Sequence, residues 1–426
     1  MGTVLAVILA GGRGQRLSIL GEERSKSAIP IAGRYRVIDF ILSNCVNSGI
    51  HNVVVLTQYE PLSLIRHIGI GVPWGLATPD RGLHLLQPYL TRQESRGWYK
   101  GTADAIYQNL QYVEEQGADL VLILCGDHVY KMDYSWMLKF HEEKQADASL
   151  AVTRLPELNL QQFGTVVLNE EGKVIGFQEK ARQPKSNLVS MGVYLFKKDI
   201  LQQWLEEDAR LSTSEHDFGR DIFPRWFNRA RVLGYDYGGY WRDIGTIQAY
   251  WQVNMDMIDM SSGGYLSDAG WPIRTSEVER PPTTISKIAN VANSLICNGC
   301  VIEGNVEHSV ISPGVIIAEG AVVRDSIVMS DGFVGSHSVI DRSILDEGVV
   351  VEAGCHLGFG NDLTANHIEP KVVNTGITIV GRRAKIPPGV RLGRNCVIYP
   401  GAGDDDFPAA EVQSGNTIRP THRTGA

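Results

Sequence analysis

The sequence predicts two structured parts, an α/β domain with a mostly parallel sheet and, after it, a parallel β-helix. The first prediction rests on continuous apolar runs, such as VLAVILA, NVVVLTQ and DLVLILCGD, that alternate with amphipathic stretches from Val4 to about Thr153. Apolar runs of this kind are typical of parallel strands covered by helices on both faces. The second prediction rests on aliphatic residues that recur every six positions in the last third of the chain.

Length and composition favour a multidomain globular protein. The chain has 426 residues, more than one ordinary hydrophobic core accommodates, and is 43% hydrophobic and 21% charged. No apolar stretch approaches the ~18 residues of a membrane span, and the first residues resemble a strand more than a secretion signal, so we expect a cytoplasmic protein with no membrane partner. The net charge of −8 argues against nucleic-acid binding.

The six cysteines do not predict a metal or redox centre. Only CNGC, residues 297–300, has a metal-binding spacing, and it lacks the second ligand pair of a structural zinc site. We therefore expect the cysteines to be small buried hydrophobic residues.

The segment AVILAGGRGQRL, residues 6–17, leads a strand directly into a loop of glycines and arginines. Glycine permits close approach of the backbone, and arginine binds anions, so the loop predicts a phosphate site. It is neither a Rossmann fingerprint, because Leu17 replaces the third glycine, nor a P-loop, because no GK[ST] follows. In parallel sheets ligands bind at the carboxyl ends of strands, where this loop and the segment CGDHVYKMDY are both expected.

The six-residue spacing of aliphatic residues in the C-terminal third predicts hexapeptide repeats. Neither a helix nor a flat sheet has this period, whereas each wall of a β-helix takes one inward aliphatic residue, with glycines 314, 320, 348 and 354 at turns. An open end of such a coil needs a cover, so we expect association with another copy. The predicted inward residues are Val310, Ile316, Val322, Val328, Val334 and Ile340, then Leu345, Val351 and Leu357 after a five-residue step, and finally Val380, Ile386, Leu392 and Ile398.

Composition predicts the domain boundaries. We expect an α/β domain over 1–260, a linker over 261–289 that is rich in Gly, Ser and Pro, a β-helix over 290–403 and a polar tail over 404–426.

Several long motifs give the chain a family resemblance. LAGGRGQRL, Lys26 and Asp127 resemble the sugar-nucleotide pyrophosphorylases, and five further motifs, in the family's order, resemble the bacterial ADP-glucose pyrophosphorylases over essentially the whole chain. The resemblance implies a Rossmann-like nucleotidyltransferase domain and a left-handed β-helix. It also implies transfer of the adenylyl group of ATP to α-D-glucose 1-phosphate, with release of pyrophosphate, the committed step of bacterial glycogen synthesis. The five motifs are RVIDFILSNCVNSGI, WYKGTADAIYQN, GDHVYKMDY, SMGVYLF and YWRDIGTIQAYW.

The resemblance also implies roles for individual residues. Asp127 and Asp243 match the positions at which the family holds Mg²⁺, although Asp127 could instead cap a helix. Arg16 and Lys26 match a triphosphate clamp and, with Asp127, the catalytic set. The nucleotide-binding residues are expected to include Gly11, Gly12, Gly14 and Tyr99. The base-reading segment after LL departs from the family, which often has a Gln pair there, so we nominate Gln87 and the backbone of Gly101 for adenine. Trp98 is expected to stack nearby, with packing as its alternative role. The implied glucose 1-phosphate residues are Tyr99, Gly164, Glu179, Lys180 and Ser190.

The chemistry implied by this resemblance needs no general base. The second pKa of a phosphate monoester is about 6, so the attacking phosphate is already ionised near neutral pH. The chain departs from the family at Ser27 and Ala181, where proline is usual, and this loses a fixed φ in two loops.

Two alternatives stay open beside an active enzyme. One is a catalytically silent regulatory subunit, and the other is an enzyme of the same fold that uses another nucleoside triphosphate. Joint retention of the charged residues favours an active enzyme. The resemblance further implies a homotetramer and an anionic allosteric effector, for which Arg24, Arg34 and Arg36 are candidates.

Overall fold

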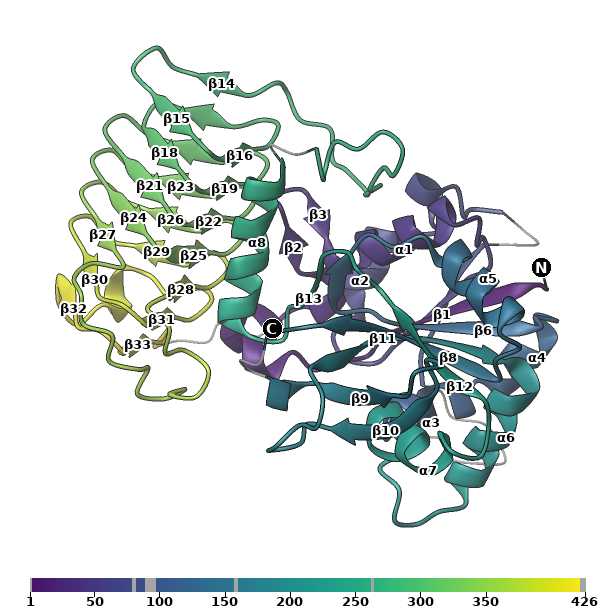
Figure 1. The fold of residues 1–426 in the computed structure, drawn as a ribbon. Coiled ribbons are helices and arrows are strands. Elements are labelled where there is room, and N and C mark those ends of the chain that lie inside the picture. Colours follow the sequence, from purple (N-terminus) through teal and green to yellow (C-terminus); the bar gives the residue numbers. More distant parts are fainter. Residues whose placement is uncertain (1, 79–81, 89–96, 157–159, 262–263, 422–426) are drawn as a thin grey trace. The chain divides into compact units, whose positions relative to one another are not determined.

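The computed structural model describes residues 2–78, 82–88, 97–156, 160–261 and 264–421 (Figure 1). The chain forms two compact units. The first consists of Met1–Gly12 and Ile38–Trp241, and the second of Arg13–Val37 and Arg242–Ala426. This division cuts across the predicted domain 1–260, because the segment after Gly12 folds with the C-terminal part of the chain.

The first unit is built on a mixed sheet with a parallel centre. In the described part of the chain its strand order is β10-β9-β11-β6-β1-β4-β5, with β8 next to β11 and β12 next to β8. The pairs β5–β4, β4–β1 and β1–β6 are parallel, which confirms the prediction from the apolar runs, whereas β11 runs antiparallel to β6 and β8. The strands are β1 (Val4–Ala10), β4 (Val53–Thr57), β5 (Leu83–Leu86), β6 (Leu120–Cys125), β8 (Ala148–Arg154), β9 (Gly164–Leu168), β10 (Val174–Glu179), β11 (Leu188–Lys197) and β12 (Val232–Asp236).

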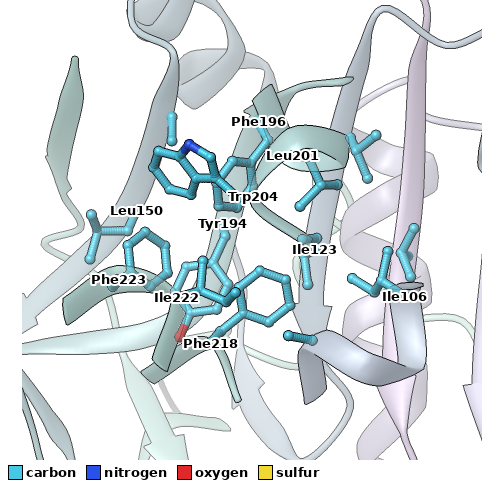
Figure 2. Close-up of a cluster of buried hydrophobic side chains, with 14 of the residues drawn as sticks. Ile106, Ile123, Leu150, Tyr194, Phe196, Leu201, Trp204, Phe218, Ile222 and Phe223 are labelled. Atoms are coloured by element: carbon cyan, nitrogen blue, oxygen red, sulfur yellow. The ribbon is translucent and has the colours of Figure 1, made fainter. Parts of the chain in front are cut away.

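Helices accompany this sheet, and one large apolar core lies between them and the strands. Figure 2 shows Ile123, Leu150, Tyr194 and Phe196 from the strands facing Trp204 and the aromatic residues near position 220. Full burial of one such side chain contributes about 1.5–3 kcal/mol, so the core holds β6 and β11 firmly in register. The helices are α1 (Val37–Asn47), α2 (Pro61–Ile68), α3 (Thr102–Tyr107), α4 (Leu110–Glu115), α5 (Tyr134–Glu143), α6 (Lys198–Ala209) and α7 (Phe223–Trp226).

The second unit contains the parallel β-helix that the six-residue spacing predicts. Short strands stack in parallel to form three walls, visible as successive coils in Figure 1. The first wall is β14 (Thr284–Ile285), β17 (Val301–Ile302), β20 (Ile316–Ile317), β23 (Phe333–Val334), β26 (Val350–Val351) and β29 (Lys385–Ile386). The second is β15 (Asn290–Ala292), β18 (Asn305–Glu307), β21 (Val322–Arg324), β24 (Val339–Asp341), β27 (His356–Leu357), β30 (Arg391–Leu392) and β32 (Glu411–Val412). The third is β16 (Leu295–Ile296), β19 (Val310–Ile311), β22 (Ile327–Val328), β25 (Ser343–Leu345), β28 (Thr378–Val380), β31 (Val397–Ile398) and β33 (Thr417–Ile418).

The predicted inward residues are correct from Val328 onward and wrong by one position before it. Ile316 is 39% exposed, whereas its neighbour Ile317 is buried in the core. The inward residue before Val328 is five positions earlier, not six. Counting back in steps of six therefore misplaces every earlier inward residue by one position. The inward residues there are Ile311, Ile317 and Val323 instead of Val310, Ile316 and Val322.

A serine ladder marks the repeat of the coil. The N–H of Ser326 donates to Ser309 Oγ at 3.1 Å, and the N–H of Ser343 donates to Ser326 Oγ at 3.0 Å, and the partners in each bond are 17 positions apart. Glycines 314, 320, 348 and 354 all have positive φ, which confirms them as turn residues. The strands run from Thr284 to Ile418, so the helix begins inside the predicted linker and its last strands lie in the predicted tail.

The second unit also holds β2 (Pro30–Ile31), β3 (Tyr35–Arg36), α8 (Ile247–Ser261) and a buried ion pair. Arg24 Nη2 lies 2.6 Å from Asp346 Oδ1, and each side chain is only 2% exposed. This pair ties the segment after the glycine loop to the β-helix. Among the described residues, no helix is both long enough and apolar enough to span a membrane.

Candidate active site

Asp127 lies in the turn between β6 and β7 (His128–Tyr130), at the carboxyl end of a buried parallel strand. The N–H of Gly126 donates to the carbonyl of Leu9 at 2.9 Å, which fixes this turn beside the end of β1. The helix-cap alternative for Asp127 is wrong, because α5 begins later and Asp133 is its cap. The Asp127 side chain is 33% exposed, so its carboxylate can meet a ligand.

Glu179 ends β10, and Lys180 follows it; the two form a charged pair, with Lys180 Nζ 3.1 Å from Glu179 Oε1. A β-carbon on Gly164 would lie 2.7 Å from Glu179 Oε2, and one on Gly219 would lie 2.6 Å from the same atom. Both glycines therefore make room for this carboxylate. Burial raises the pKa of the Glu179 carboxyl above its usual value, and the Lys180 ammonium opposes this shift.

Ser190 lies on β11, and its side chain is buried and hydrogen-bonded. Its hydroxyl donates to the Tyr194 phenol oxygen at 3.3 Å. Burial raises the pKa of Tyr194 well above its ordinary value, so that phenol stays protonated. The ladder between β11 and β8 is irregular between Ser190 and Tyr194, as at a β-bulge.

In the second unit the structure brings together Arg16, Lys26 and Asp243. Lys26 Nζ lies 2.9 Å from Asp243 Oδ1, although 217 residues separate them. Asp243 ends β13 (Trp241–Asp243). A β-carbon on Gly245 would lie 2.7 Å from Arg16 Nη2 and would also collide with the Asp243 carboxylate. Two cations and one carboxylate thus form a compact polar group that suits a polyphosphate and its counterion.

The positions of the opening loop that carry glycine differ in why they favour it. Gly14 has a φ of +65° and precedes the 3₁₀ segment Gln15–Gly21, a conformation that favours glycine. A β-carbon on Gly11 would lie 3.3 Å from the Cβ of Gln58, whereas Gly12 has open space around it. Gly12 is therefore the position at which backbone approach by a ligand is least obstructed.

Apart from Gly14, the residues predicted to bind the nucleotide lie in the first unit. Trp98 is 62% exposed and stacks on Tyr59, with ring centroids 5.2 Å apart, so packing accounts for part of its role. Tyr99 receives a hydrogen bond on its hydroxyl from Asn109 at 3.0 Å. A β-carbon on Gly101 would collide with the carbonyl oxygens of Glu215 and His216, which explains glycine there without a ligand. Gln87 is exposed directly after β5.

The structure adds residues that the sequence analysis missed. Gly219 crowds against Glu179 although no sequence spacing links the two, whereas Gly245, which crowds against Asp243, lies two positions after it in WRDIG. Cys125 and His128 flank Asp127, and one ligand atom from each of the three lies within 4.8 Å of the others. From the sequence, Cys125 was expected to be only a small buried hydrophobic residue. The motif CGDH is the sequence signal that could have pointed to Cys125 and His128.

The three arginines proposed for an anionic effector each have a carboxylate neighbour. Arg24 pairs with Asp346, Arg34 contacts Glu277, and Arg36 Nη2 lies 3.9 Å from Glu347 Oε1. Arg24 is too deeply buried to meet a small anion, so it serves the fold.

Comparisons with known proteins identify the family of the chain. Residues 5–260 match the nucleotidyl transferase family model, and residues 282–380 match the GlmU-like, C-terminal hexapeptide model. The glucose-1-phosphate adenylyltransferase of Thermomicrobium roseum is 49% identical over 99% of this chain and 98% of the relative. The enzymes of that name from Acetivibrio thermocellus and Thermotoga maritima are 44% and 41% identical, and the alignments cover at least 97% of each chain. The chain therefore belongs to the glucose-1-phosphate adenylyltransferase family.

Proposed function

We propose that this protein transfers the adenylyl group of ATP to α-D-glucose 1-phosphate and releases pyrophosphate. The observation that carries the proposal is the match to adenylyltransferases of that name over nearly the whole chain, with the predicted charged site residues all present. In the reaction a phosphate oxygen of glucose 1-phosphate bonds to the α-phosphorus, and the bond to the β-phosphate breaks. Because the attacking phosphate is already ionised, the protein must mainly position reactants and offset charge.

The charged side chains divide this work between the two substrates. Arg16 and Lys26 offset negative charge on the triphosphate and on the departing pyrophosphate. Asp243 orients the Lys26 ammonium through the 2.9 Å contact. Lys180 meets the phosphate of glucose 1-phosphate, and Glu179 and Ser190 bind hydroxyl groups of the sugar. Gly164 and Gly219 leave space for the Glu179 carboxylate.

The proposal includes Mg²⁺, for which the family resemblance implies Asp127 and Asp243 as carboxylate ligands. Both groups fit a hard cation, since they supply carboxylate oxygens and neither side chain is fully buried. A bound divalent ion supplies positive charge that polarises phosphate oxygens.

The experiment that tests the activity is pyrophosphate release by the full-length protein with glucose 1-phosphate and each of five nucleoside triphosphates in turn. Release with ATP at the highest kcat/KM supports the proposal. A higher kcat/KM with another triphosphate would identify that nucleotide as the donor in place of ATP. No pyrophosphate release with any of the five would favour the silent regulatory subunit.

Lys180→Gln should raise the KM for glucose 1-phosphate by roughly 10- to 150-fold. The variant loses a charge-assisted hydrogen bond worth about 1.5–3 kcal/mol, and each 1.4 kcal/mol corresponds to about tenfold. The contact exists in both the ground and transition states, so kcat should change far less, and the KM for ATP should barely move. Initial rates with each substrate varied in turn measure the two effects.

Lys185→Gln is the matched control, because it makes the same change at an exposed lysine shortly after Lys180. It should leave both KM values unchanged. A loss confined to ATP would move Lys180 to the triphosphate site, and no loss for either substrate would remove it from the site.

The proposal also includes a cytoplasmic homotetramer with an anionic effector. The family resemblance and the exposed first strand of the β-helix, β14, support association. Sedimentation of the full-length protein at micromolar concentration should give four times the chain mass of 46.9 kDa. A monomer at that concentration would exclude the tetramer. Arg34 and Arg36 remain the candidate contacts for the effector, since Arg24 is buried.

A further inference from the structure

Three different metal ligands converge at the end of β6. One ligand atom from each of Cys125, Asp127 and His128 lies within 4.8 Å of the other two, and all three side chains are partly exposed. His128 Nε2 lies 3.3 Å from Asp127 Oδ1. Tetrahedral zinc with bonds of about 2.0–2.2 Å to nitrogen and oxygen requires an N···O separation of about 3.4 Å, close to the observed one.

The imidazole is already oriented for metal binding. His128 Nδ1 lies 2.9 Å from the carbonyl oxygen of Met191, and because a carbonyl only accepts, Nδ1 carries the proton in this contact. Nε2 is then the nitrogen directed at the Asp127 carboxylate. A backbone carbonyl on the far ring nitrogen is the usual outer partner of a metal-binding histidine, since it fixes both the tautomer and the ring orientation.

The irregular part of β11 builds this arrangement. Gly192 lies there with a φ of +67°, beside the Met191 carbonyl that receives the Nδ1 hydrogen bond. A β-carbon on Gly192 would lie 2.6 Å from Cys125 Sγ and 3.1 Å from His128 Cε1. Glycine at this position therefore allows the thiol and the imidazole to lie on the same side of Asp127.

We propose that Cys125, Asp127 and His128 bind a zinc-class divalent cation through Sγ, a carboxylate oxygen and Nε2. Thiolate and imidazole are ligands that zinc accepts and magnesium does not favour, so this donor set differs from the carboxylate pair proposed for Mg²⁺. The thiol releases its proton to solvent on binding, and the thiolate and carboxylate balance the ionic charge. Three protein ligands leave a fourth position for water or a phosphate oxygen.

The bound cation would inhibit adenylyl transfer, a consequence that rests on the proposed function. Asp127 belongs to both donor sets, and one carboxylate held by zinc beside a thiolate cannot serve the magnesium-dependent reaction in the same way. The site thus makes the reaction sensitive to zinc in the presence of excess magnesium.

Metal binding by the metal-stripped, full-length protein tests the site independently of activity. Equilibrium dialysis should find a single Zn²⁺ per chain, and Co²⁺ in its place should show an absorption band for charge transfer from thiolate to cobalt. Cys125→Ser should abolish this band and weaken Zn²⁺ binding by at least about tenfold. The control Cys297→Ser, at another partly exposed cysteine, should keep both properties.

A second variant covers the case in which Cys125→Ser does not fold, as judged by circular dichroism. In His128→Asn the amide can still donate to the Met191 carbonyl, but the Nε2 ligand is gone, so Zn²⁺ binding should again weaken by at least about tenfold. Unchanged Zn²⁺ affinity in the folded variants, or an equal loss in Cys297→Ser, would overturn the proposed site.

Activity measured with saturating Mg²⁺ separates this inference from the proposed function. Zn²⁺ should inhibit the wild type, and Cys125→Ser should need at least about tenfold more Zn²⁺ for the same inhibition. Zinc binding that depends on Cys125 in a protein without any transferase activity would reject the proposed function and keep the site. Normal transfer with equal zinc sensitivity in the variant and the wild type would reject the inhibition.

Discussion

Replacing Asp127 by asparagine is expected to lower the rate of adenylyl transfer by about 10²–10³. The amide has the shape of the carboxylate but not its charge. The turn at the end of β6 can therefore accept asparagine with little rearrangement of its backbone. Turnover with saturating ATP and glucose 1-phosphate measures the loss. Thermal unfolding of the same sample should be close to that of the wild type, because the side chain is partly exposed.

Asp133→Asn is the matched control for this variant. Asp133 caps α5 by accepting the N–H of Ser135 at 2.9 Å, and asparagine caps helices about as well as aspartate. The control should therefore keep both turnover and stability. More than about a third of the wild-type rate in Asp127→Asn would contradict an electrostatic role of the usual size. A much lower melting temperature would instead make Asp127 a structural residue.

Asp346→Asn is expected to lower the free energy of unfolding of the second unit by about 3–5 kcal/mol. The variant leaves the Arg24 guanidinium buried without its 2.6 Å counterion, and Glu347, at 4.0 Å, offsets only part of the charge. Removal of one partner of a buried ion pair is costly because the remaining charge has already lost its hydration. Urea unfolding followed by circular dichroism measures the shift of the transition.

Glu411→Gln is the control, because it makes the equivalent change in an exposed pair of the same β-helix. Arg391 Nη1 lies 3.2 Å from Glu411 Oε2, and the side chains are 50% and 43% exposed. Exposed pairs contribute about 0–1 kcal/mol, so the unfolding transition should hardly move. Equal shifts in the two variants would show that burial of the Arg24–Asp346 pair does not increase its contribution to the free energy of unfolding.

The architecture was predictable because two patterns of burial repeat over long stretches. Continuous apolar runs predicted the parallel strands, and the six-residue period predicted the β-helix. The period could not give the register before Val328, since one five-residue step moves every earlier inward residue by one position. The polar composition after residue 403 predicted a tail outside the β-helix. In the structure, Glu411 and its neighbours instead form a further coil, held by backbone hydrogen bonds to β30.

The candidate site was predictable only as separate pieces. Motifs could nominate Lys26 and Asp243, but their 2.9 Å contact depends on a fold that joins residues 217 positions apart. In the same way, Gly219, which makes room for the Glu179 carboxylate, comes from a segment well beyond β10 in the chain. Cys125 is partly exposed instead of buried, and its position beside Asp127 and His128 could not be predicted, because a thiol's surroundings are set by the fold and not by its spacing.

Arg16 and Lys26 fold with the β-helix, so a triphosphate held by them is a ligand of that unit. A ligand that binds only the native state raises its stability by about 2.7 kcal/mol at a hundredfold excess over Kd. The heat resistance of the repeat coils would therefore rise and fall with the concentration of free nucleotide. A calorimetric scan would register this linkage as a nucleotide-dependent shift in the melting of strands that lie far along the chain from the glycine loop.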